Sequence, residues 1–172
     1  MTGHPEPTDV DRARSPRVRL DGPAAAHGET ALVVGHCRTR GSETVLAVAG
    51  DLARRTGAVV HVVHAISLDD YPVDPDADDW EAQAARVLQD QRAEVATALD
   101  GLVPGWSYHA ARGDPVHLLA AVAEEHDALM IIVGNRGDGP AAALNRLLHR
   151  SVSRAVIGRQ RRPVLVVPLA HG

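Results

Sequence analysis

Two hydrophobic patterns alternate along most of the chain. Short apolar runs bounded by polar loop residues predict buried strands, because a strand covered on both faces of a sheet has no polar side. Between them, apolar residues recur every three or four positions, which predicts amphipathic helices. The predicted strands are residues 31–36, 58–66, 106–111, 127–133 and 164–167. The predicted helical segments are residues 42–57 with their caps, 80–99, 116–125 and 143–157.

This alternation predicts an α/β fold in which helices cover both faces of a parallel sheet. In such sheets a ligand crevice lies beyond the carboxyl ends of the strands, where the strand order reverses. The loops after the first and fourth predicted strands are therefore the candidates for a site. Ser42 is the expected N-cap of the first helix, Gly57 its expected stop, and Gly113-Asp114-Pro115 the expected start of the third.

The chain of 172 residues is predicted to form one domain, from about residue 29 to 170. Residues 1–28 contain four prolines, eight charges and few large apolar side chains. Such a segment cannot bury enough apolar surface to offset its ordering entropy, so we expect a disordered or loosely ordered tail. No apolar stretch resembles a signal peptide or reaches membrane-spanning length, which predicts a cytoplasmic protein with no membrane partner.

Composition excludes several kinds of chemistry. The chain has no lysine, so Schiff-base and Walker-type phosphate lysines are excluded. It has four aromatic residues and a formal net charge of −4, which argues against nucleic acid as a partner. Cys37 is the only cysteine, so no intrachain disulfide or cysteine-rich zinc site can form.

A glycine cluster, Gly134, Gly137 and Gly139, lies between a predicted buried strand and a predicted helix. Its backbone N–H groups could bind an anion, or it could be an ordinary turn; the spacing alone leaves both open. Seven arginines and one acid lie between Gly134 and Arg162. Most of these arginines are expected on a solvated helix face, and Arg136 and Arg150 are the best placed to bind phosphate.

Several other motifs lack a residue or an arrangement that their chemistry requires. A cysteine phosphatase loop needs an arginine six positions after Cys37, and Glu43 stands there. His61 and His64 point to opposite faces of their predicted strand, so no shared metal site is expected. No catalytic triad or paired-carboxylate arrangement is visible. Cys37, beside two arginines, is either a passive small side chain or a redox-sensitive thiol.

Seven segments, in order, resemble the universal stress protein family: residues 32–35, 52–57, 62–64, 113–115, 131–137, 151–156 and 162–168. The resemblance implies a single-domain Rossmann-like sandwich of the adenine-nucleotide alpha-hydrolase-like kind. Its parallel sheet would have five strands in the order 3-2-1-4-5. The resemblance also implies a role in stress survival and a homodimer formed through the last strand, Val164–Val167.

Many members of that family bind ATP between strands one and four. Their signature is glycine, two residues, glycine, nine residues, then glycine followed by serine or threonine. Here twelve residues, 138–149, replace the nine, Arg150 stands at the third glycine, and Cys37 stands at the family's adenine-contacting aspartate. The nucleotide site implied, for ATP alone or with Mg²⁺, consists of Gly35, His36, Cys37, Val62, Val133, Gly134, Arg136, Gly137, Arg150, Ser151, Val152 and Ser153.

Two hypotheses follow. In the first, the protein is a dimeric regulator that binds an adenine nucleotide and at most hydrolyses ATP slowly, because no general base is identifiable. In the second, Arg150 and the insertion close the pocket, and the chain is a nucleotide-independent module for a regulatory protein partner, with Cys37 as a redox-sensitive thiol.

Overall fold

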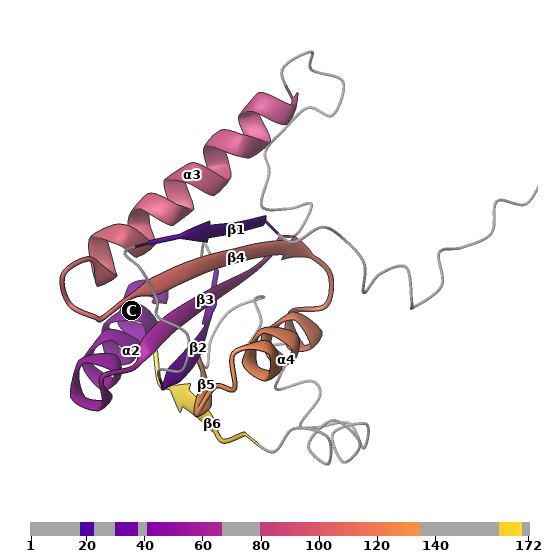
Figure 1. Ribbon diagram of the computed structural model, residues 1–172. Helices are drawn as coiled ribbons and strands as arrows, with labels where there is room; N and C mark the ends of the chain where they lie inside the picture. Colours follow the sequence, from indigo (N-terminus) through magenta and orange to yellow (C-terminus); the bar gives the residue numbers. More distant parts are fainter. Residues whose placement is uncertain (1–17, 23–29, 38–40, 67–79, 135–161, 170–172) are drawn as a thin grey trace, which may run out of the picture.

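The computed structural model describes residues 18–22, 30–37, 41–66, 80–134 and 162–169 (Figure 1). These residues form the strands β1 (Val18–Asp21), β2 (Ala31–His36), β3 (Val59–Ile66), β4 (Trp106–Arg112), β5 (Met130–Gly134) and β6 (Val164–Val167). The helices are α2 (Ser42–Thr56), α3 (Trp80–Leu99) and α4 (Pro115–Glu125). The strands build one six-stranded sheet in the order β1-β4-β3-β2-β5-β6.

Five of the strands, β4-β3-β2-β5-β6, are parallel neighbours, and their order is the predicted 3-2-1-4-5. The prediction of a five-stranded, purely parallel sheet is nevertheless wrong. β1 pairs antiparallel with β4 and adds a sixth strand at that edge. It comes from the segment that composition predicts as a tail. Leu20 packs against the core from this strand, and a backbone ladder joins the four residues of β1 to β4.

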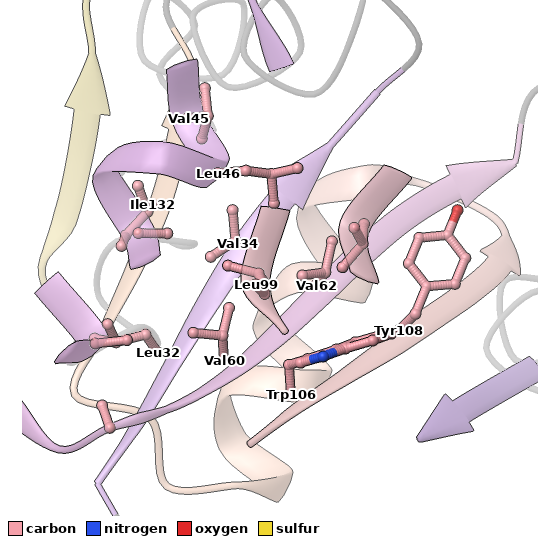
Figure 2. Packing of buried hydrophobic residues seen from close by; sticks show 14 of the residues in the cluster. Leu32, Val34, Val45, Leu46, Val60, Val62, Leu99, Trp106, Tyr108 and Ile132 are labelled. Carbon is pink, nitrogen blue, oxygen red and sulfur yellow. The ribbon is translucent and has the colours of Figure 1, made fainter. Parts of the chain in front are cut away.

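Helices cover both faces of the sheet, as the alternating pattern predicts. α2 and α3 lie on one side and α4 on the other (Figure 1). Side chains alternate between the faces, so Val34, Val62 and Tyr108 join the cluster under α2 and α3 (Figure 2). Val33 and Val133 join the smaller cluster under α4.

Two of the observed helix caps agree with the caps predicted from sequence, and one differs. Gly57 caps α2 in a left-handed conformation, and Asp114 caps α4 through the His117 N–H, with Pro115 following. The prediction of Ser42 as N-cap is wrong: the cap is Gly41, with φ 101°, and none of the described side chains caps the helix. A left-handed turn at Gly41 makes Ser42 the first helical residue, so its hydroxyl cannot take the capping position.

The helix predicted over residues 143–157 lies outside the described residues. Within the part of the chain that the structure describes, none of the helices has the length and apolar composition to cross a membrane.

Candidate functional site

The strand order reverses between β2 and β5. From β2 the chain builds outward through β3 and β4, and then returns to the other side of β2 with β5 and β6. The strand that follows β2 therefore lies on one side and the strand that follows β5 on the other, and a ligand crevice is expected beyond the carboxyl ends at such a reversal. Gly35, His36 and Cys37 come from the end of β2 and Gly134 from the end of β5, so the structure brings these predicted residues to one edge.

Glycine at these strand ends permits close packing. A Cβ atom added to Gly35 would lie 3.2 Å from Cγ1 of Val133, and one added to Gly134 would lie 3.0 Å from Cδ1 of Leu169. Leu169, which follows β6, is buried and also lies close to Gly41, where an added Cβ would stand 2.7 Å from its Cδ1. Leu169 therefore fills space between the start of α2 and the end of β5.

The side chain of His36 points to the face that α3 covers. It is buried, its ring lies 6.1 Å from that of His64 and 6.2 Å from that of Tyr108, and its Nε2 is 4.0 Å from Oε2 of Glu94. His64 Nδ1 donates a hydrogen bond to the carbonyl oxygen of His36 at 3.2 Å. Tyr108 donates to Oε1 of Gln91 at 2.6 Å.

Burial, together with the neighbouring His64, lowers the pKa of His36 from 6.5 to about 4. The imidazole is therefore neutral at pH 7. The His36 side chain therefore belongs to the α3 interface.

The other predicted site residues are placed differently. Val62 and Val133 are fully buried, and they lie on opposite faces of the sheet, so their side chains do not line one pocket. Cys37 is half-buried directly after β2. The second half of the predicted site lies outside the described residues: Arg136, Gly137, Arg150, Ser151, Val152 and Ser153.

A second group of polar side chains, which the sequence pattern does not predict, lies on the α4 face. His61 from β3, Ser107 and His109 from β4, and His126 after α4 come together there. The expectation that His61 and His64 face opposite sides is confirmed, since His64 packs with Tyr108 instead. The available signal was Ser107 and His109, two apart on a strand and therefore on one face.

This strand order, with helices on both faces, defines a Rossmann-like α/β protein with a topological switch point between β2 and β5. The sequence model of the universal stress protein family matches residues 30–168. The chain therefore belongs to the universal stress protein family. A comparison with curated protein sequences gives no match.

Solved structures show the same fold at low sequence identity. Universal stress protein UspA from Lactobacillus plantarum is 20% identical, with a TM-score of 0.54 over 83% of this chain and 99% of that one. A universal stress protein described in complex with cAMP is 23% identical, with a TM-score of 0.53 over 81% and 97%. A universal stress protein from Archaeoglobus fulgidus is 24% identical, with a TM-score of 0.50 over 80% and 92%.

Proposed function

We propose that the protein binds ATP or a related adenine nucleotide in the crevice between β2 and β5, in a regulatory stress-response role. The observation that carries this proposal is the meeting of Gly35–Cys37 and Gly134 at the switch point of the sheet. Family membership supports it, and one protein of similar fold is described in complex with cAMP.

Backbone groups supply the recognition in this proposal. The N–H and C=O groups of Gly35, His36 and Cys37 hydrogen-bond the adenine, because no aspartate follows β2. The backbone after Gly134 holds the ribose and phosphates. Arg136, Arg150 and the Ser151 hydroxyl add charge and donors for the phosphate oxygens, alone or with Mg²⁺.

Calorimetric titration of the full chain with ATP and Mg²⁺ tests this function. We expect saturable heat and a thermal shift, both absent with a nucleotide-free buffer. No heat and no shift at millimolar nucleotide would reject it. Arg150→Gly is expected to weaken binding by removing a phosphate contact, whereas Arg146→Ala, from the same segment but outside the signature, leaves binding unchanged.

One observation favours a second function, a nucleotide-independent module that binds a regulatory protein partner. Leu169 already fills the space beside Gly41 and Gly134. If Leu169 and Arg150 together close the crevice, Arg150→Gly or Leu169→Ala gains nucleotide binding that the unmodified chain lacks. The direction of the change caused by Arg150→Gly therefore separates the two functions.

A further inference from the structure

Three histidines from three different elements meet on the face of the sheet that α4 covers. His61 comes from β3, His109 from β4, and His126 directly follows α4. Each offers one ring nitrogen, and the three nitrogens lie within 4.8 Å of one another. His61 and His109 are buried and His126 is partly buried. None of the three has a role in the proposed nucleotide site.

One pair of nitrogens already stands at the separation that a shared metal ion requires. His61 Nδ1 and His109 Nε2 are 3.4 Å apart. Two nitrogens bound tetrahedrally to zinc at about 2.0–2.1 Å stand about 3.3–3.4 Å apart. The His126 ring stacks on that of His61, with centroids 3.7 Å apart and planes inclined by 12°. Because the lone pair of an imidazole lies in its ring plane, His126 must tilt out of this stack to share an ion with His61.

Ser107 holds two of the histidines in this arrangement. Its Oγ lies 2.7 Å from His61 Nδ1 and 2.7 Å from His109 Nε2. A hydroxyl donates a single hydrogen, so one of these nitrogens accepts from Ser107 and the other donates to it. A metal ion would take both nitrogens as lone-pair donors, and the hydroxyl would rotate aside or approach the open fourth position.

Two charged side chains lie near the cluster, Arg19 and Glu125. Arg19 lies on β1 beside His109 in the antiparallel ladder. Glu125 offsets that positive charge, and its Oε1 is 3.7 Å from His126 Nε2. A carboxylate beside a histidine is the usual outer support of a metal ligand.

We propose that His61, His109 and His126 form a binding site for a divalent transition metal ion, with Zn²⁺ as its first candidate. Three imidazole nitrogens suit zinc and its neighbours in the transition series, whereas Mg²⁺ and Ca²⁺ prefer oxygen ligands. The ion ties the end of α4 to β3 and β4. α4 runs antiparallel to the strands. His126, at its end, therefore lies towards the amino ends of the strands, away from the proposed nucleotide site at their carboxyl ends. The two sites can therefore be tested separately.

Titration of the chelator-treated full chain with ZnCl₂ tests the site. We expect one ion bound per chain by calorimetry and a rise in Tm of roughly 5–10 °C at a free concentration about 100 times the Kd. Co²⁺ is expected to give the visible absorption of a four-coordinate centre, and MgCl₂ to give neither effect. On binding, the ring ¹⁵N resonances of three histidines shift in NMR spectra. Absence of Zn²⁺ and Co²⁺ binding would overturn the proposal.

Variants locate the ion. His126→Ala removes the ligand nearest the surface, whose side chain is 18% exposed, and is expected to weaken Zn²⁺ binding by at least about 10–100-fold. Ser107→Ala keeps all three nitrogens and is expected to retain binding. His117→Ala is the matched control, because this histidine lies on α4, the helix that His126 follows, and is 79% exposed. Unchanged zinc affinity in His126→Ala would contradict the assignment, and the NMR shifts of the unmodified chain decide the case if that variant does not fold.

Discussion

At the scale of single residues, buried histidines link the stability of the fold to pH. His36 is 1% exposed, and burial with the neighbouring His64 lowers its pKa from 6.5 to about 4. Tyr108 from β4 and Glu94 from α3 also face it. In the unfolded chain the imidazole takes a proton near pH 6.5, whereas in the folded chain it stays neutral until about pH 4. The unfolded state therefore binds more protons between these values, and stability falls as the pH falls through that window.

His36 is expected to contribute up to about 3 kcal/mol to this loss between pH 6.5 and 4. His36→Asn should be less stable than the unmodified chain at pH 7 but should lose less stability on acidification. Urea unfolding at pH 7, 5.5 and 4.5 measures the difference, with the exposed His117→Asn as control. Parallel losses in His36→Asn and the unmodified chain would show that His36 is not the linked group.

Gly41 and Gly57 separate two reasons for glycine at a helix end. Both have positive φ, 101° and 66°, but an added Cβ at Gly41 would lie 2.7 Å from Leu169, whereas none of the described atoms lies within 4 Å at Gly57. Gly57→Ala is expected to cost about 1 kcal/mol from backbone conformation alone. Gly41→Ala is expected to cost about 1–3 kcal/mol more, because Leu169 must move.

Chemical denaturation of these variants gives the two costs. In the Leu169→Ala background the extra cost of Gly41→Ala should largely vanish, which a double-mutant cycle measures. Equal costs for Gly41→Ala and Gly57→Ala in the unmodified chain would mean that Leu169 does not restrict the start of α2.

At the scale of elements, α4 depends on its N-cap residue, Asp114, for a defined start. The Asp114 carboxylate accepts a hydrogen bond from the His117 N–H at 3.1 Å, and Pro115 fixes the first helical position. Asp114→Ala leaves that N–H without its cap and is expected to lower the free energy of unfolding by about 1 kcal/mol. Asp114→Asn retains an accepting oxygen and should lose only a few tenths. A loss of the same size in both variants would assign the effect to charge instead of capping.

Elements with strong local patterns could be predicted from sequence, and elements held by distant contacts could not. The bounds of β2, α3 and β6 match the prediction because each is an uninterrupted apolar run or stripe. β1 could not be predicted, since its four residues are stable only against β4, far along the chain. At the candidate site, the prediction that the ends of β2 and β5 lie together is correct. The sequence could not show that Val62 and Val133 face opposite sides.

The histidine cluster could not be predicted from the sequence for the same reason. His61 and His109 are separated by 48 positions, and only the pairing of β3 with β4 makes them neighbours. The sequence spacing of these histidines does not predict a metal site. The register of β3 against β4 and the position of the end of α4 bring the three side chains together.

At the scale of the whole molecule, the two edges of the sheet differ. Among the described strands, β1 forms one edge and pairs only with β4, and β6 forms the other and pairs only with β5. Three consecutive residues of β6 are apolar and exposed, Val164 at 42%, Leu165 at 36% and Val166 at 46%. An apolar edge of this kind favours pairing with another strand. We therefore expect two copies to associate through β6.

The backbone of β6 makes this expectation specific. The Pro163 carbonyl accepts from Ile131 N–H, so alternation along the strand turns the backbone groups of Val164 and Val166 to the outer edge. Val166→Pro removes an outward N–H and leaves the bonds to β5 in place. We expect light scattering at micromolar concentration to give twice the 18.2 kDa chain mass for the unmodified protein and a single chain mass for Val166→Pro. Val166→Thr keeps the N–H and the branched shape, so it should remain a dimer. A monomeric unmodified chain, or a dimeric Val166→Pro, would exclude pairing through this edge.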